Sequence, residues 1–392
     1  MSAQKLKILH VFRAPVGGVF RHVCDLAEMQ AEAGHEVGFI CDSLTGGPFE
    51  LEKLAKVEEI LSLGLVRTPM NRPIRPNDVG AFRRVRAHAA SLGPDIIHGH
   101  GAKGGVFARL SAAAERRAGR QVATFYTLHA GSLNFDPRSA NGRLYFGVER
   151  MLELVSDGLI HVSAFEAATY REKVGIPRCP AYVIHNGLRP EEFQPLASSD
   201  RQADFLVIGE LRPAKGIDVF LESLRLLQDA GRSPSVMIVG GGAPEALETY
   251  PRLAEELELK NVAFHPPMPA REAFARARCI VVPSLHESLP YVVLEAAAAG
   301  MPMISTNIGG IPEIFLGEEA RLIEAGNPAV LAHALHDALD DLPRLASEAQ
   351  ARQQSVRERF SLAGMAQDIE AVYRDALARR RGEVSQNLRS AA

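Results

Sequence analysis

The sequence predicts two α/β domains of the doubly wound kind, in which a parallel sheet is covered by helices on both faces. Apolar segments of strand length alternate with helical segments through both halves of the chain. A length of 392 residues with 46% hydrophobic content is enough for two cores of ordinary size. Near the middle, the turn-rich segment 186–195 and the polar stretch 198–201 separate the halves. We therefore expect two domains joined by a short linker.

Strands and helices can be placed individually from the apolar pattern. Helices are expected at Val19–Ala33, closed by Gly34, and at Val79–Ser91. The first half has candidate strands near Ile8 and at Val37–Cys41, Ile96–Ile97, Val122–Tyr126, Gly158–Val162 and Ala181–Ile184. The second half has candidate strands at Phe205–Ile208, Val236–Val239, Val262–Phe264, Ile280–Val282 and Met303–Ser305.

These elements predict an N-terminal domain over residues 1–190 and a C-terminal domain over residues 200–360. A last helix is expected at 361–380. The polar tail 381–392 is expected to be disordered.

Composition narrows the function classes. The net charge of -3 and the absence of Trp argue against a dedicated nucleic-acid binder. Four cysteines show no paired metal-ligand spacing, so we expect reduced thiols in a cytoplasmic protein. Neither a signal-peptide core nor an apolar window of membrane-spanning length is found in the sequence.

The segment 283–302 carries the strongest functional pattern. A buried strand at 279–282 leads into a loop with Glu287, and a helix beginning at Tyr291 carries Glu295. At ~1.5 Å per helical residue, eight positions cover at most ~12 Å, about the length of a sugar, its diphosphate and a ribose. One carboxylate can bind each end. The amides of Ser288 and Leu289 lie near a helix N-terminus, where anions are attracted.

A second strand, glycine turn and helix follow directly at 303–313, and the loops of consecutive parallel units meet at one edge of the sheet. This run resembles the retaining glycosyltransferases of family 4, whose two motif glutamates match Glu287 and Glu295 without a gap. The junction 184–195 also resembles that family, so the resemblance covers nearly the whole chain. The alternative from the residues alone is a surface Glu287 and a Glu295 that supports the first helical turn.

The resemblance implies the GT-B fold, two Rossmann-like domains with a cleft between them. In that fold the helix at 361–380 crosses back onto the N-terminal domain; otherwise it is an ordinary last helix of the second domain. The resemblance further implies that Glu287 binds the transferred sugar and Glu295 the nucleotide ribose.

A phosphate-binding loop is expected at 209–216, where two cations follow a strand. Fixed cations stabilise the charge of a departing diphosphate without a metal. Lys215 matches the family's lysine, whereas Glu210 stands where the family has an arginine, and Arg212 is the candidate replacement. The glycine turn Gly17-Gly18 opens the first helix and, by resemblance, approaches the diphosphate and the acceptor.

Histidines end two strands of the first half. His129 resembles a family histidine that binds a hydroxyl of the transferred sugar, although a strand-end histidine is more often structural. His98 and His100 suggest a metal site, but no third ligand is evident from the sequence, so no metal site is expected.

The expected function is sugar transfer from a nucleoside diphosphate donor to a glycan or lipid-linked acceptor, with retention of configuration and with no cofactor or metal. No Asp-x-Asp motif is present, which disfavours the metal-dependent transferases of the other major fold. A nucleotide-sugar 2-epimerase and a non-catalytic glycan-binding protein are the alternatives. A dinucleotide oxidoreductase is disfavoured because segment 14–19 lacks its glycine fingerprint.

Basic stretches in the first half raise the expectation of peripheral contact with the cytoplasmic face of a membrane, against the default of solvated helix faces. They consist of Arg72, Arg75, Arg83, Arg84 and Arg86, and of Arg116, Arg117 and Arg120.

Overall fold

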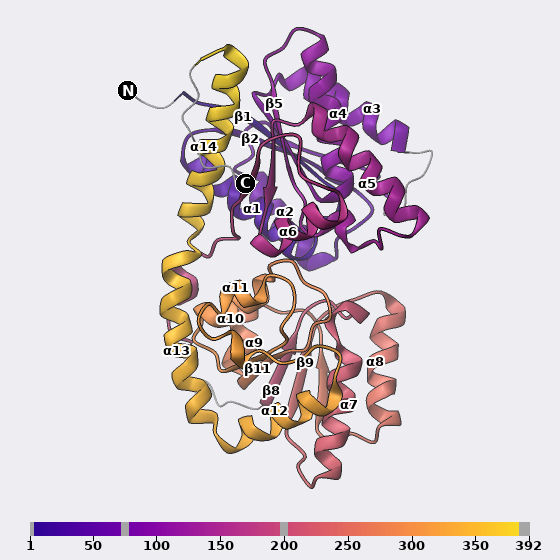
Figure 1. Ribbon diagram of the computed structural model, residues 1–392, viewed down its shortest axis with the longest axis vertical. Coiled ribbons are helices and arrows are strands. Elements are labelled where there is room, and N and C mark those ends of the chain that lie inside the picture. The colour runs from indigo at the N-terminus through magenta and orange to yellow at the C-terminus, as the bar shows by residue number, and fades with distance from the viewer. Residues whose placement is uncertain (1–3, 72–77, 197–202, 384–392) are drawn as a thin grey trace. The chain divides into compact units, whose positions relative to one another are not determined.

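The computed structural model describes residues 4–71, 78–196 and 203–383, and the chain divides into two compact units (Figure 1). Unit 1 comprises Met1–Gly187 and Leu362–Ala392, and unit 2 comprises Leu188–Ser361. Unit 1 thus ends three residues before the predicted boundary at 190 and takes in the last helix. The predicted disordered tail lies outside the described residues from position 384 onward.

The described part of unit 1 contains a seven-stranded parallel sheet in the order β3-β2-β1-β4-β5-β6-β7. Its strands are β1 (Lys7–Phe12), β2 (Glu36–Asp42), β3 (Leu65–Thr68), β4 (Ile96–His100), β5 (Ala123–Thr127), β6 (Gly158–His161) and β7 (Ala181–Val183). Its α-helices are α1 (Gly17–Glu32), α2 (Pro48–Glu58), α3 (Asp78–Leu92), α4 (Gly101–Arg117), α5 (Ala140–Leu152), α6 (Ala164–Lys173) and α14 (Leu362–Arg381).

The order of strands reverses between β1 and β4. From β1 the chain builds outward through β2 and β3, and it then returns to add β4 on the other side. The parallel register places His10 opposite His98 and Phe12 opposite His100. In doubly wound sheets, ligands bind beyond the carboxyl ends of the strands at this switch point.

The last helix, α14, supplies part of the core of unit 1. Its buried residues Ile369, Val372 and Tyr373 belong to one apolar cluster with Ile8 and Phe125 of the sheet. The helix also lies beside α1 (Figure 1). Truncating the chain before α14 would therefore expose part of this core.

The described part of unit 2 contains a five-stranded parallel sheet in the order β10-β9-β8-β11-β12. Its strands are β8 (Ala203–Ile208), β9 (Val236–Val239), β10 (Val262–His265), β11 (Ala277–Val282) and β12 (Met303–Ser305). Its α-helices are α7 (Ile217–Asp229), α8 (Pro244–Glu256), α9 (Ala270–Ala275), α10 (Tyr291–Ala298), α11 (Ile311–Ile314), α12 (Pro328–Asp340) and α13 (Leu342–Arg359). Here the switch point lies between β8 and β11.

The two predicted doubly wound α/β domains are confirmed. One strand, β3, was missed because it is a four-residue edge strand in which only Thr68 is fully buried, so it leaves little apolar pattern. None of the described helices has the length and apolar character needed to cross a membrane.

Candidate functional site

The loops of unit 2 that follow β8 and β11 are joined at the switch point. The amide of Leu285 donates to the carbonyl of Ala214 at 2.8 Å. A Cβ on Gly216 would lie 2.1 Å from the carbonyl oxygen of Pro283, so only glycine lets the two loops approach this closely. Gly216 also has φ of +64°, which disfavours any other residue.

The loop after β12 is fixed to the same edge. The amide of Gly310 donates to the carbonyl of Ser288 at 2.6 Å. A Cβ on Gly309 would lie 2.1 Å from the carbonyl oxygen of Glu287. The backbone around Glu287 is therefore held by the loops on both of its sides.

These loops bring Lys215 and Glu287 into direct contact, although 72 positions separate them in the sequence. The Nζ of Lys215 donates to Oε1 of Glu287 at 2.5 Å, and Oγ of Ser284 donates to the same oxygen at 2.9 Å. The side chains of Lys215 and Glu287 are only 16% and 8% exposed. The sequence predicted both residues but not their contact, and it missed Ser284.

The pair offers one cation and one carboxylate at the place where doubly wound sheets bind ligands. A bound diphosphate would give Lys215 a second anionic partner. Glu287, fixed by Ser284, could then accept hydrogen bonds from ligand hydroxyls. This arrangement fits a ligand that carries phosphate and polyol groups side by side.

Arg212 lies just before this pair at the start of the turn Pro213–Lys215. Its Nε is 3.2 Å from a carboxylate oxygen of Glu210, and both side chains are substantially exposed. Glu210 thus contacts Arg212, as expected if it orients the guanidinium. An exposed pair of this kind contributes little to stability.

The Arg212→Ala variant is expected to weaken binding of a nucleoside diphosphate about tenfold or more, because a guanidinium is a strong phosphate donor. Isothermal titration of UDP and GDP into the variant and the parent protein measures this effect. The matched control is Arg278→Ala. It removes an exposed arginine that pairs with Asp204 at the amino-terminal ends of β11 and β8, the ends away from these loops. Equal affinity in Arg212→Ala and the parent would mean that Arg212 takes no part in phosphate binding.

The remaining predicted residues of unit 2 lie on and just before α10. Glu295 is within this helix and partly buried, Leu289 is buried, and Ser288 is partly buried. The helix ends at Ala298, and Gly300 shortly after it is in the left-handed region at φ of +65°.

The predicted residues of unit 1 lie at the carboxyl edge of its sheet. Gly17 begins α1 with φ of +64°, and both Gly17 and Gly18 are exposed. His129 follows β5, is partly buried, and has φ of +50°, an uncommon value for a residue with a side chain. The amide of the next residue, Ala130, donates to the buried carboxylate of Glu166 at 2.6 Å, which helps to hold this backbone.

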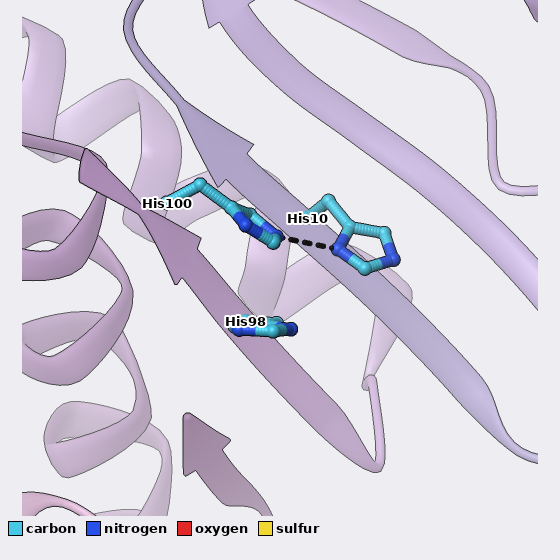
Figure 2. A group of neighbouring side chains, drawn as sticks. All are labelled: His10, His98 and His100. Carbon is cyan, nitrogen blue, oxygen red and sulfur yellow. Dashed lines mark hydrogen bonds between the residues drawn. The ribbon is translucent and has the colours of Figure 1, made fainter. Parts of the chain in front are cut away.

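The structure supplies the third neighbour of His98 and His100 that was not evident from the sequence. Pairing of β1 with β4 places His10 beside both, and ring nitrogens of the three lie within 4.8 Å of one another (Figure 2). His10 sits alone among apolar residues in β1, so nothing in the local sequence indicated the contact. A second group, His22, His100 and His129, satisfies the same 4.8 Å limit.

Most ring nitrogens of the first group have other partners. His98 lies 2.6 Å from the Tyr373 hydroxyl and 2.8 Å from the Thr127 hydroxyl. His10 lies 2.8 Å from Oε1 of Gln30 and 3.0 Å from His100, the contact drawn in Figure 2. This group is therefore a hydrogen-bonded cluster.

Burial keeps the histidines of both groups neutral. It lowers the pKa of His10 and of His22 to about 4, and it lowers the pKa of His98, His100 and His129 well below the ordinary value. The unfolded chain, with a histidine pKa of ~6.5, binds more protons than the folded protein at mildly acid pH. The contribution of these neutral histidines to the free energy of unfolding is therefore fully present above pH ~6.5. It is lost as the pH falls toward 4.

At pH 5, each of His10 and His22 is expected to lower the free energy of unfolding by ~2 kcal/mol relative to pH 7. Urea unfolding at both pH values, with chelator present, measures the change. The His22→Gln variant should lose less stability over this range than the parent, whereas the exposed-site control His333→Gln should lose as much. An equal loss in His22→Gln and the parent would contradict the account.

The basic stretches of unit 1 are partly engaged within the chain. Arg84 donates to Thr68 at 2.6 Å, Arg116 to Asp157 at 3.2 Å and Arg120 to Glu115 at 2.5 Å. The predicted positions Arg72 and Arg75 lie outside the described residues. These contacts reduce the number of arginines available to a membrane surface.

Comparison with known proteins identifies the family. The model described as Glycosyltransferase Family 4 matches residues 16–192, and the model described as Glycosyl transferases group 1 matches residues 189–356. One after the other, these two matches cover most of the residues of unit 1 and of unit 2. The chain is a glycosyltransferase of the family 4 type.

Individual relatives are similar in sequence to this glycosyltransferase over most of its length. EpsD of Bacillus subtilis, named as a glycosyltransferase, is 29% identical over 339 residues, which cover 82% of this chain and 86% of EpsD. Glycogen synthase of Mycobacterium tuberculosis is 27% identical over 390 residues, covering 94% and 92% of the two chains.

A solved structure shows the same fold. Anabaena Alr3699/HepE in complex with UDP-glucose is similar with a TM-score of 0.75 and 17% sequence identity, over 93% of this chain and 98% of that protein. The predicted GT-B fold class, two Rossmann-like α/β domains, is thereby confirmed.

Proposed function

We propose that this glycosyltransferase moves a sugar from a nucleoside diphosphate donor to a glycan or lipid-linked acceptor, with retention of anomeric configuration, in surface polysaccharide synthesis of the bacterial type. The observation that carries the proposal is the contact of Lys215 with Glu287 at the switch point of unit 2. The pair supplies the two kinds of group that a nucleotide sugar needs there. Lys215 is a cation for phosphate, and Glu287 is a carboxylate for hydroxyls.

In the proposed reaction, the bond between the anomeric carbon and the diphosphate oxygen breaks, and the acceptor oxygen bonds to the same face of that carbon. The acceptor proton leaves with the diphosphate. Lys215 and Arg212 stabilise the negative charge that develops on the leaving group, so Mg²⁺ is not required for this step.

The family resemblance gives roles to the other predicted residues of each unit. Glu287 binds hydroxyls of the transferred sugar and Glu295 binds the nucleotide ribose. In unit 2, the amides of Ser288 and Leu289 contact the diphosphate. In unit 1, the turn Gly17-Gly18 has the family's role toward the diphosphate and the acceptor. His129 contacts a sugar hydroxyl. These roles follow from the family resemblance and from the positions at the two sheet edges.

Solved structures of similar fold support the choice of a uridine diphosphate sugar as donor. The Anabaena protein was solved with UDP-glucose, and a TarM mutant of S. aureus was solved with UDP and alpha-GlcNAc-glycerol. A uridine diphosphate sugar is therefore the first donor to test. A lipid-linked acceptor would bring the protein to the cytoplasmic face of a membrane.

The test is incubation with single nucleotide sugars, with and without glycan acceptors, followed by proton NMR of the anomeric signals. We expect a new glycosidic product of the donor's own anomeric configuration only when acceptor is present, and little change on adding Mg²⁺. Conversion of the donor to its 2-epimer without acceptor would instead identify an epimerase. Glycan binding without any turnover would overturn the proposal in favour of a binding protein.

A further inference from the structure

The second histidine group lies at the carboxyl edge of the unit 1 sheet. His22 comes from α1, His100 ends β4 and His129 follows β5. His22 and His100 are buried to 0% and 1% exposure, and His129 is partly exposed. One nitrogen from each ring lies within 4.8 Å of the others.

His22 has an unexplained ring nitrogen. Its Nδ1 lies 3.1 Å from Oδ1 of Asn186, an acceptor, so Nδ1 carries the hydrogen. In the neutral ring, Nε2 then has a free lone pair. This Nε2 is buried and has no hydrogen-bond partner in the described part of the chain. A buried lone pair without a donor is uncommon and requires an explanation.

The hydrogen bonds of His100 leave a lone pair on its ring nitrogen that faces His129. His10 donates from Nε2 to Oε1 of Gln30, which leaves its Nδ1 as an acceptor. His100 must therefore donate from Nε2 to His10 at 3.0 Å, and its Nδ1 has the lone pair. That Nδ1 faces Nε2 of His129 at 3.3 Å.

The separation of 3.3 Å is within hydrogen-bond range and also suits two ligands of one ion. Zn–N bonds of ~2.0–2.1 Å at a tetrahedral angle place ligand nitrogens ~3.3–3.4 Å apart. By contrast, the 3.0 Å contact of His10 with His100 has ordinary hydrogen-bond length. Figure 2 shows this contact within the group of His10, His98 and His100.

The surroundings favour a cation. Asp25 and Glu166 are buried to 3% and 1% exposure, and both carboxylates act electrostatically on His22. Asp25 also pairs with Arg21 at 3.3 Å, so the charge of Glu166 would be the main one to offset that of a divalent ion. Asn186 and His10 accept the second ring hydrogens of two ligands, as outer partners of metal-bound histidines usually do.

We propose that His22, His100 and His129 form a zinc site, with Nε2 of His22, Nδ1 of His100 and Nε2 of His129 as ligands. Three imidazole ligands are a common zinc set and leave a fourth position for water or a substrate oxygen. The ion would fix the His129 ring and leave its Nδ1–H free to donate to a ligand. Burial lowers the pKa of all three rings, which keeps them in the neutral form that binds metal.

The proposal is tested on the full chain after chelator treatment, by titration with Zn²⁺ and with Co²⁺ as a coloured probe. One equivalent of metal is expected to bind, with the visible absorption of tetrahedral Co²⁺ and a higher melting temperature. His22→Gln and His100→Gln should each weaken metal binding at least 100-fold. Near-ultraviolet circular dichroism checks that each variant is folded.

Two controls separate this site from other histidines. His98→Gln should keep metal binding within about threefold, because both nitrogens of His98 have partners elsewhere. The exposed pair His333 and His336 on α12 offers a competing surface site, and His333→Gln/His336→Gln should leave the one equivalent unchanged.

If the His22 and His100 variants do not fold, ¹⁵N NMR of the histidine rings of the parent protein decides instead. Addition of Zn²⁺ should shift Nε2 of His22, Nδ1 of His100 and Nε2 of His129, and leave both nitrogens of His98 in place. No binding at 10-fold molar excess of Zn²⁺, or metal binding that survives loss of His22, would overturn the proposal. Because sugar transfer is not measured, the outcome is independent of the proposed function.

Discussion

The Glu287→Ala variant is expected to lose at least 100-fold in kcat/KM for sugar transfer. In the structure its carboxylate is nearly buried and accepts hydrogen bonds from Lys215 and Ser284, so it is fixed in one position. If Glu287 binds the transferred sugar as proposed, removing this fixed group costs on the order of 10²–10³ in rate. Initial rates with the best donor measure the loss.

This variant also changes stability, which the sequence did not indicate. The sequence placed Glu287 in a loop, but alanine at Glu287 would leave Lys215 as a poorly exposed cation without its partner. Glu287→Gln keeps the shape and one hydrogen-bond acceptor, and it should be nearly as inactive but more stable. The control is Glu245→Ala, an exposed carboxylate near the start of α8. Near-parental turnover in a folded Glu287→Gln protein would remove Glu287 from the site.

The Lys215→Ala variant is expected to lose ~2–4 kcal/mol of transition-state stabilisation, about 30- to 1000-fold in kcat/KM. The reason is that, in the proposed reaction, Lys215 supplies a fixed positive charge beside the leaving diphosphate. Affinity for nucleoside diphosphate should fall as well, because the same charge acts on the product. Steady-state kinetics and isothermal titration measure the two effects. Lys260→Ala, which removes an exposed lysine of unit 2, is the matched control.

The double variant Lys215→Ala/Glu287→Ala tests whether the two residues act together. Since they share one hydrogen bond at 2.5 Å, the effects on stability should be far from additive, and the double variant should be more stable than the sum of the single losses predicts. Thermal unfolding of the four proteins completes the cycle. Additive stability losses would show that the contact contributes nothing in solution.

The fold was largely predictable because parallel strands buried on both faces produce continuous apolar runs. The five described strands of the unit 2 sheet all coincide with predicted apolar runs, and glycine turns follow β8, β9 and β12. The edge strand β3 was missed because its apolar run is short and three of its four residues are only partly buried.

The contacts of the candidate site were only partly predictable. Lys215 and Glu287 could be found because each lies in a loop after a strand, and the family resemblance marks both. Their ion pair depends on the strand order, which places β8 beside β11, and that order is not encoded locally. In the same way, His22 and His10 are far in sequence from His100, and only the packing of α1 and β1 brings them together.

The central claim is that unit 2 binds a nucleoside diphosphate through Lys215 without a metal. Isothermal titration of UDP, GDP and ADP into the protein, in buffer free of divalent ions, tests it most directly. The account predicts that at least one of them binds with one-to-one stoichiometry, and that binding weakens at least tenfold in Lys215→Ala but not in Lys260→Ala. Binding that requires Mg²⁺, or equal affinity in parent and Lys215→Ala, would contradict it.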